Sequence, residues 1–348
     1  MLVRVSSGSR YADSKEEHKV NPATVTVVVV TFRAKAMIAD CLDSLAAQDL
    51  PHELLVVDNA SSDGTADVLR SKYPGVRVIT LAENRGFAGG LSAALAHIES
   101  PYVALLNDDA VAEPGWLSQL LAVCESDERI GAATSKMILE TGFPGEEVLN
   151  NIGVALTRHG YGFDVGLGLP ASSAYTEVTE VFGFSGGAAL IRTESLRAAG
   201  GCPEHFFLYY EDVDMSWRLR LSGFAVMSVP GAIAHHRHSA TSDQNSEIFH
   251  RHNERNRLLT LIRCAPAGFA ASEVLRFGLT TISLAVTKVI RRPVPPALNF
   301  RIRLRVGVLA EVARLLPSEC VARRRIGRTA VVSRRSVTSA WVGAKPLD

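Results

Sequence analysis

Several patterns that mark other classes of protein are missing from the 348-residue sequence. The cysteines are odd in number, widely scattered and never in a C-x-x-C pair: Cys41, Cys124, Cys202, Cys264 and Cys320. This spacing argues against a zinc site and favours a reducing compartment. Residues 1–21 are polar and charged and contain no apolar core of a secretory signal, so we expect no signal peptide.

Long apolar runs are scarce as well. The longest, Phe277–Ile290, contains Lys288 and falls short of the roughly 20 residues that a membrane-spanning helix needs. We therefore expect a protein of the cytoplasm, either soluble or held at the inner face of the cell membrane.

The charges are balanced in number, with 37 Lys and Arg against 36 Asp and Glu, but not in position. Only Glu311, Glu319 and Asp348 are acidic from Arg291 onward, whereas the same segment contains many arginines (Arg291, Arg292, Arg301, Arg303, Arg305, Arg314, Arg323, Arg324, Arg325, Arg328, Arg334, Arg335). One interpretation is a solvated or partly disordered end. Another is a basic amphipathic surface that binds anionic lipid. No aromatic platform accompanies the basic residues, so we expect no nucleic-acid partner.

The N-terminal half alternates apolar runs with helical patterns. The runs at 25–30, 53–58, 76–81 and 102–107 are too uniformly apolar for strands with one wet face, and they indicate parallel strands buried on both sides. Apolar residues between them recur at helical spacing (Ile38, Cys41, Leu42 and Leu45; Ala66–Leu69 behind a cap at Asp63; Leu91, Ala94, Leu95 and Ile98). This alternation predicts an α/β fold with a Rossmann-like, mostly parallel sheet flanked by helices.

Polar residues follow each predicted strand: Thr31; Asp58 and Asn59; Glu83, Asn84 and Arg85; Asn107, Asp108 and Asp109. Each group alone has an ordinary explanation, because Asx residues start turns and cap helices. Together they predict a ligand site, because the carboxyl ends of parallel strands share one edge of the sheet and ligands bind there.

The ligand must be held without the usual phosphate loops. No G-x-x-x-x-G-K-[ST] segment occurs, and the first strand does not lead into G-x-G-x-x-G. Two adjacent carboxylates at a strand end can instead bind Mg²⁺ or Mn²⁺, which would neutralise a diphosphate. Turn chemistry is the alternative for Asn107–Asp109.

An ordered set of motifs resembles an inverting glycosyltransferase of family two with the GT-A fold, in the rhamnosyltransferase and galactofuranosyltransferase-like branch. The motifs span about residues 24–263: VVVVTFRAKAMIADCLDSLAAQ, LLVVDNASSDGTADVL, NRGFAGG, VALLNDDAVAEPGWL, FFLYYEDVDMSWRLRLSGF, HHRHSATS and RNRLL. The resemblance implies that Asp109 is the principal metal ligand and that Asp108 lies beside it at the donor. It also implies that Asp58 contacts the nucleobase, and that Thr31, Asn84 and Arg85 line the nucleotide pocket.

The second half supplies candidate catalytic groups. Glu211, Asp212 and Asp214 cluster at the start of a predicted helix whose apolar residues can bury. A carboxylate there can cap the helix, or it can remove a proton from an acceptor hydroxyl. The resemblance implies that Asp212 is the general base and that Glu211 is an acceptor contact.

Further residues are open to two interpretations. Three histidines follow an apolar run, and the resemblance implies that His235 or His236, but not which, completes the metal site. Arg255 can cap the donor phosphates or form a salt bridge on a helix surface. Gly186 and Gly187 can let the backbone approach an acceptor sugar, or they can serve the tight packing of two strands. The segment GCPEHFF departs from the usual Gly-Phe-Asp-Glu run, which leaves the acceptor loop uncertain.

We predict a polar extension at 1–22, a catalytic domain at 23–265 and a basic helical appendage at 266–348. The appendage would contain helices at 272–289 and 300–316, separated by a proline-rich break, and an end that is partly disordered. It would hold the catalytic domain at an anionic membrane that carries a lipid-linked acceptor.

These patterns predict a metal-dependent inverting glycosyltransferase that moves a sugar from a nucleotide-diphosphate donor to a cell-surface glycan or its lipid-linked precursor. Resemblance to the rhamnosyltransferase and galactofuranosyltransferase-like branch favours a dTDP-rhamnose donor, and uridine-diphosphate donors are the alternative. A sugar-phosphate nucleotidyltransferase is an alternative, but its glycine-rich loop should follow the first strand, where this chain has TFRAKAM. The other alternative is a non-catalytic nucleotide-sugar or glycan-binding scaffold, in which Asp109 or Asp212 would be lost.

Overall fold

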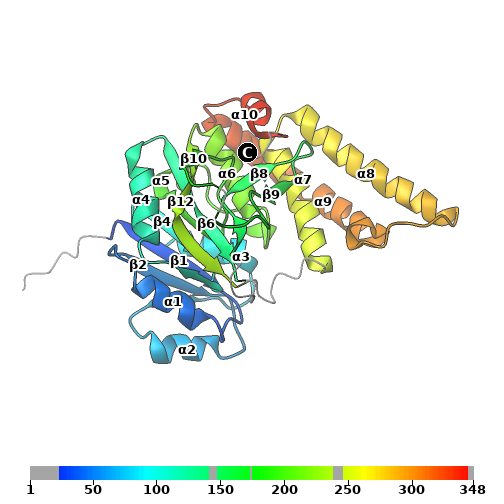
Figure 1. Cartoon of the computed structure of the whole chain (residues 1–348). Coiled ribbons are helices and arrows are strands. Elements are labelled where there is room, and N and C mark those ends of the chain that lie inside the picture. The colour runs from blue at the N-terminus through cyan, green and yellow to red at the C-terminus, as the bar shows by residue number, and fades with distance from the viewer. Residues whose placement is uncertain (1–22, 141–146, 173–174, 238–245, 344–348) are drawn as a thin grey trace, which may run out of the picture.

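The computed structural model describes residues 23–140, 147–172, 175–237 and 246–343. It shows one large twisted sheet with helices on both sides and a helical hairpin that projects from the body (Figure 1). The predicted extension at 1–22, the histidine at position 238 and residues 344–348 lie outside the described residues.

The four predicted strands form one half of the sheet: β1 (Val25–Thr31), β2 (Glu53–Asp58), β3 (Arg77–Thr80) and β4 (Tyr102–Leu106). They lie in the order β3-β2-β1-β4, and every neighbour in that set is parallel. Thr31 pairs with Asp58, which pairs in turn with Thr80, so their carboxyl ends share one edge as predicted.

The first helices connect these strands. In α1 (Ile38–Ala46), the four residues predicted to face the core are all buried. In α2 (Thr65–Lys72), Gly64 occupies the N-cap position, and Asp63 Oδ1 accepts from the Thr65 N–H at 3.1 Å. The third helix, α3 (Gly86–Leu95), buries Leu91 and Ala94.

The second half of the sheet is mixed. Its long strands are β6 (Ile130–Leu139) and β12 (Ala225–His236), which are parallel to each other, and β11 (Ala188–Arg192) runs antiparallel between β6 and β4. The shorter elements of this region are β5 (Ala110–Ala112), α4 (Trp116–Ser126), β7 (Val148–Asn151), β8 (Val154–Leu156), β9 (Gly162–Asp164), β10 (Thr179–Glu180), α5 (Thr193–Ala198) and η1 (Glu204–Phe206). The α/β prediction is confirmed.

Two helices cover the second half: α6 (Glu211–Leu221) and α7 (Glu247–Cys264). A buried ionic network joins them, because Asp214 pairs with Arg218 and Arg263, each at 2.7 Å. Arg263 also pairs with Glu319 at 3.0 Å, which extends the network into the C-terminal segment. The acidic residues at the start of α6 therefore differ in position. Asp214 is buried in the core, whereas Asp212 lines a cavity.

The C-terminal segment contains α8 (Ala267–Val289), η2 (Leu298–Phe300), α9 (Ile302–Thr329) and α10 (Arg334–Trp341). The predicted helix end at residue 316 is wrong, because α9 continues through Pro317, and the predicted loose end contains α10. Trp341 packs back against the body, with the Arg220 guanidinium 4.4 Å from its ring centre. The C-terminal helices thus share the core of the sheet domain.

The prediction that the apolar run is too short to span a membrane also needs correction. Because α8 begins at Ala267, it has 23 residues, and among the described residues it is the helix long and apolar enough to cross a membrane by length and composition.

Candidate active site

A cavity of about 440 Å³ lies at the edge where the parallel strands end. This volume falls in the range of small-molecule sites. Its lining combines strand ends, the turn before β11, and the starts of α3, α6 and α7: Val30, Phe32, Asn59, Asn84, Gly86, Phe87, Asn107, Asp108, Asp109, Gly186, Gly187, Phe207, Leu208, Tyr209, Glu211, Asp212, His236 and Ile248. The two predicted halves of the site, the Asp108–Asp109 pair and the Glu211–Asp212 pair, therefore face one space.

The turn after β4 places Asp109 beside a histidine. The chain turns at Asn107, whose carbonyl accepts from the Ala110 N–H at 3.1 Å, and continues into β5. Because β5 pairs antiparallel with β12, Ala110 lies opposite His236. The Oδ1 atom of Asp109 is consequently 3.1 Å from Nε2 of His236.

The two candidate histidines differ in position. His235 has its Nε2 atom 2.7 Å from Glu113 and is outside the cavity lining. His236 lines the cavity, and its Nδ1 atom is 2.7 Å from Oδ1 of Asn150. Successive side chains of a strand point to opposite faces, which explains the difference. We therefore select His236 as the candidate ligand.

Acidic side chains dominate the charge of the cavity. Burial raises the pKa of Asp108 to about 6, although the Phe32 N–H donates to its Oδ2 at 3.3 Å. Within the described part of the chain, the lining includes four carboxyl groups and one imidazole but no lysine or arginine. A bound cation would offset the charge of these carboxylates for an anionic ligand.

Asp212 is fixed by two backbone donors. The Gly186 N–H donates to its Oδ2 at 3.1 Å, and the Val213 N–H donates to its Oδ1 at 2.7 Å. Burial raises the pKa of Asp212, and these hydrogen bonds oppose that shift. Burial, together with the neighbouring charge of Asp212, raises the pKa of Glu211 to about 8. Glu211 therefore keeps its proton near neutral pH.

A strained loop leads into the catalytic helix. Phe207, Tyr209 and Tyr210 have φ of 65°, 68° and 71°, a left-handed conformation that costs free energy for residues other than glycine. Asn256 on α7 stabilises this loop, because its Nδ2 group donates to the carbonyls of Phe206, Leu208 and Tyr209. Such strain next to a functional site is a recurrent feature of binding loops.

Arg255 also stabilises this loop. Its guanidinium donates to the carbonyl of Phe206 at 2.7 Å and pairs with Glu311 at 3.0 Å. It does not line the cavity. These contacts match the salt-bridge alternative, and we interpret Arg255 as a residue that positions the loop; a contact with the donor phosphates stays a prediction.

Of the four residues predicted to contact the nucleotide, only one lines the cavity. Asn84 lines the cavity, and its Oδ1 atom accepts from the Gly86 N–H at 2.8 Å. Thr31 and Asp58 are buried at their strand ends, outside the lining, and Asp58 accepts from the Ser61 N–H at 3.0 Å. Arg85 pairs with Glu204 and is outside the lining as well.

The sequence pattern puts Asn59 at the sheet edge with the other polar residues but gives it no role in the site. It lines the cavity, donates to the Gly86 carbonyl at 2.9 Å and accepts from the Arg85 N–H at 2.8 Å. Asn59 thus joins the end of β2 to the start of α3. Its position directly after Asp58 at a strand end was the signal available in the sequence.

The two glycines of the turn before β11 serve different purposes. A Cβ atom on Gly187 would lie 2.9 Å from Met137 Cε, so tight packing explains that glycine. A Cβ atom on Gly186 would make only ordinary contacts, 3.5 Å from Phe87 and 3.7 Å from Asp212 Cβ. Packing does not require Gly186, so its size keeps space open beside Asp212.

Sequence patterns do not indicate the apolar part of the lining or a third acidic group. Phe32, Phe87, Phe207 and Ile248 come from separate segments and meet only in the folded cavity. Asp164 on β9 is close enough to sense the charge of Asp212, and burial raises its pKa to about 7. No spacing in the sequence relates these residues.

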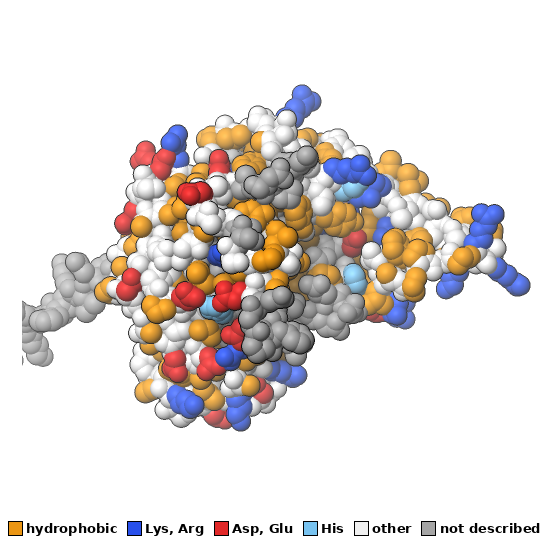
Figure 2. Space-filling view, in the orientation of Figure 1, with side chains coloured by type: hydrophobic (Ala, Val, Ile, Leu, Met, Phe, Trp, Pro, Cys, Tyr) orange, Lys and Arg blue, Asp and Glu red, His pale blue; other side chains and the backbone are white. Residues whose placement is uncertain are grey.

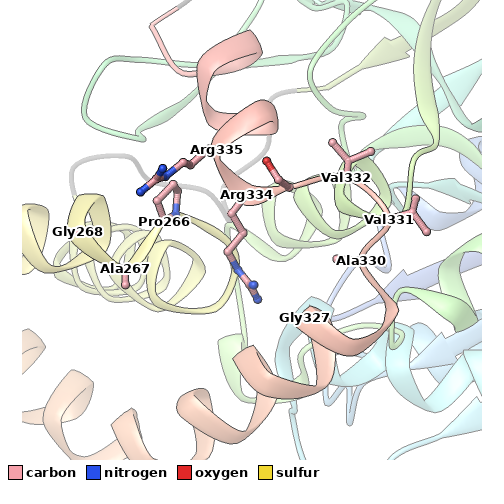
Figure 3. Close-up of a pocket in the computed structure, with 10 residues that line it drawn as sticks. Pro266, Ala267, Gly268, Gly327, Ala330, Val331, Val332, Arg334 and Arg335 are labelled. Atoms are coloured by element: carbon pink, nitrogen blue, oxygen red, sulfur yellow. The ribbon is translucent and has the colours of Figure 1, made fainter.

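A second hollow, of about 620 Å³, lies between the start of α8, the end of α9 and the start of α10 (Figure 3). It shares no described residue with the cavity above. Its lining includes Arg334 and Arg335 but no carboxylate or histidine, and Arg334 donates to the Arg323 carbonyl at 2.8 Å. It offers neither a base nor a ligand set for a metal.

Residues 26–161 match the family model of glycosyl transferase family 2. The chain is 28% identical over 251 residues to N-acetylglucosaminyl-diphospho-decaprenol L-rhamnosyltransferase of Mycobacterium tuberculosis. This match covers 65% of this chain and 80% of that protein. It is 26% identical over 202 residues to the O-antigen chain rhamnosyltransferase WbaN of Salmonella anatum, covering 57% of this chain and 61% of that protein.

The fold is similar to that of GalNAc-T7 in a crystal structure with UDP, GalNAc and Mn²⁺. The TM-score is 0.58 at 15% sequence identity, and the match covers 86% of this chain and 58% of that chain. At this identity the likeness shows the fold, which is GT-A.

Proposed function

We propose that this chain is a member of glycosyl transferase family 2 and that it transfers a sugar, with inversion and with the help of a divalent cation, from a nucleotide-diphosphate donor to a glycan or lipid-linked acceptor. One observation carries the proposal: the Asp109–His236 pair and Asp212 line the same cavity. The pair suits a donor diphosphate and Asp212 suits an acceptor hydroxyl.

The residues present fit a cation such as Mg²⁺ or Mn²⁺. If the His236 ring is neutral and its Nδ1–H donates to Asn150, the lone pair of Nε2 faces the Asp109 carboxylate. Two lone pairs in this position suit a shared metal ion. Among the described residues no third His, Cys, Asp or Glu completes the set. That is appropriate for an ion that takes its remaining ligands from phosphates and water. When bound, it would neutralise the leaving diphosphate.

The residues of the chain account for the transfer. The Asp212 carboxylate removes the proton of an acceptor hydroxyl while that oxygen forms its bond to the anomeric carbon of the sugar. The bond from this carbon to the diphosphate oxygen breaks, and its electron pair leaves with the nucleoside diphosphate. Attack from the face opposite the leaving group inverts the configuration. The N–H of Gly186 keeps Asp212 aimed at the acceptor side.

The proposal also includes the identity of the donor sugar and of the acceptor. Two similar proteins are named as rhamnosyltransferases, and one name includes a diphospho-decaprenol acceptor. These names support a dTDP-rhamnose donor and a lipid-linked acceptor for this chain, and uridine-diphosphate donors stay in the test. The apolar wall at Phe32, Phe87 and Ile248 suits a ligand with an apolar face.

Calorimetric titration with a panel of nucleotide-diphosphate sugars, each with and without Mn²⁺, tests the proposal. We expect one donor to bind, and only with the cation. Equal binding with and without Mn²⁺ would contradict the metal assignment. If the folded protein bound no donor, either alone or with a lipid-linked acceptor present, the non-catalytic scaffold would replace the enzyme.

A further inference from the structure

The helix α8 has a buried face and an exposed face. The buried face packs against the body and contains Ala270, Glu273, Phe277, Thr281 and Leu284. Arg305 of α9 anchors this face, because it donates to Thr281 Oγ1 at 2.9 Å and to the Phe277 carbonyl at 3.0 Å. Packing inside the protein therefore explains the apolar residues of the buried face alone.

The opposite face is exposed, although it is made of large apolar side chains. We call it the α8 stripe: Leu275, Leu279, Ile282, Val286, Val289 and Ile290, which are 53–80% exposed. The first five recur at intervals of three or four residues, which puts them on one side of the helix, and Ile290 follows directly after its end. Isolated apolar residues on a surface are ordinary, but five aligned on one helix mark a contact surface.

Basic residues surround the tip of the hairpin to which the stripe belongs. Lys288, Arg291, Arg292 and Arg303 are exposed there. From Val274 to Ala310 the sequence contains no Asp or Glu. Figure 2 shows basic and hydrophobic side chains together on the projecting hairpin. A surface that is apolar along its length and positive at its tip complements an anionic lipid bilayer.

The hairpin is connected to the entrance of the active-site cavity. Arg301, just before α9, pairs with Glu247 at the start of α7. The next residue of α7, Ile248, lines the cavity and is 59% exposed. An acceptor anchored in the surface that α8 contacts would therefore enter the cavity near Ile248.

We propose that the α8 stripe docks on an anionic membrane, with α8 lying in the plane of the interface and the tip arginines contacting lipid headgroups. The buried face of α8 stays on α9, so the helix does not cross the bilayer. Vesicle binding requires neither donor nor metal ion. Failure of this proposal would therefore leave the proposed function untouched, and the reverse also holds.

Flotation of the full chain with vesicles tests the apolar part. We expect binding to vesicles containing phosphatidylglycerol and on the order of tenfold weaker partitioning for Leu279→Ser/Ile282→Ser. The matched control is Leu167→Ser/Leu169→Ser, because these leucines are 52% and 45% exposed but belong to another surface. Equal binding by the stripe variant and wild type, or an equal loss in the control, would overturn the proposal.

Charge reversal tests the basic part. Arg291→Glu/Arg292→Glu should weaken binding by about fivefold per neutralised charge on anionic vesicles, and wild type should bind pure phosphatidylcholine far less well. Arg70→Glu/Lys72→Glu on α2 should bind as wild type does. No binding by wild type to anionic vesicles would overturn the proposal.

Two other results would also overturn it. If the stripe instead buries a second copy of the chain, sedimentation would show a dimer that the stripe variant converts to a monomer, with no vesicle binding. If α8 spans the bilayer, the protein would stay with membranes after alkaline carbonate extraction.

Discussion

The backbone N–H of Gly186 donates to Oδ2 of Asp212 at 3.1 Å, which ties the turn before β11 to the first turn of α6. This contact fixes a carboxylate at the cavity wall without a positively charged side chain beside it. A salt bridge would hold the carboxylate as well but would lower its basicity. Burial keeps the pKa of Asp212 raised although this backbone donor lowers it, and a general base needs that proton affinity.

Asp212→Asn should retain donor binding and lose transfer. The amide keeps the shape of the carboxylate but cannot accept the acceptor proton, so the rate should fall by about a hundredfold to ten-thousandfold. Transfer kinetics and calorimetric donor binding measure the two effects separately. Turnover at the wild-type rate would remove Asp212 from the mechanism.

Asp109→Ala should abolish the cation dependence of donor binding, and His236→Ala should weaken it by a smaller factor. The structure provides a matched control, because His235 is the adjacent residue but pairs with Glu113 outside the lining. His235→Ala should therefore bind donor and Mn²⁺ as wild type does. A larger loss in His235→Ala than in His236→Ala would reverse the assignment of the two histidines.

The sequence predicted the parts of the site that depend on local pattern. Uniformly apolar runs identified β1, β2 and β4, and parallel pairing then placed Asn84, Asp108 and Asp109 near one edge. The choice between His235 and His236 could not be made in the same way. It depends on the register of β5 against β12, a contact between segments that are far apart in the chain.

Tertiary contacts also bear on what the sequence leaves open. Arg255 is predicted to cap the donor phosphates or to form a salt bridge, and in the structure the loop at Phe206 offers it carbonyl groups and α9 offers it Glu311. The helix predicted at 300–316 also extends further in the structure. It continues through Pro317, and Glu319, beyond the proline, pairs with buried Arg263. Neither partner can be identified from spacing alone.

Glu211 should make the protein less stable as the pH rises. Its folded pKa, about 8, lies above the usual value of 4.5 because burial and the charge of Asp212 disfavour ionisation. The stabilisation is therefore fully present below about pH 4.5 and is lost as the pH rises through about 8. Urea unfolding of the metal-free protein at about pH 5 and about pH 9 measures the loss, which should be on the order of a few kcal/mol.

Glu211→Gln should remove most of that pH dependence, because the amide does not ionise. Glu125→Gln, on the exposed side of α4, is the control and should keep the wild-type profile. If Glu211→Gln and wild type lose the same stability between the two pH values, another group is responsible.

Arg255→Met should lower stability more than it affects affinity for the donor. The substitution leaves the mostly buried Glu311 with Arg251 as its remaining ion-pair partner, so we expect the loss of one charged hydrogen bond, about 1.5–3 kcal/mol. Because the loop before Asp212 loses a support, the turnover number should fall as well. Thermal unfolding and steady-state kinetics separate the two roles. A raised KM for the donor with unchanged thermal stability would favour the alternative that Arg255 caps the donor phosphates.

Gly86→Ala should damage both stability and activity, because two independent constraints act at this residue. Its φ is +67°, and a Cβ atom would overlap the carbonyl oxygen of Phe207. That carbonyl accepts from the Ala88 N–H at 3.1 Å, so the start of α3 and the strained loop at Phe207 are built against each other. A methyl group would separate them at a cost of at least about 2 kcal/mol.

The matched control is Gly75→Ala, because a Cβ atom there would meet nothing within 4 Å. It should unfold and turn over as wild type does. The comparison also tests whether the loop geometry is needed for catalysis, since Phe207 lines the cavity and Asp212 follows closely in the chain. If Gly86→Ala were destabilised but kept full turnover, the contact between α3 and the loop would serve folding alone, and Asp212 would be positioned by its Gly186 contact without help from the loop.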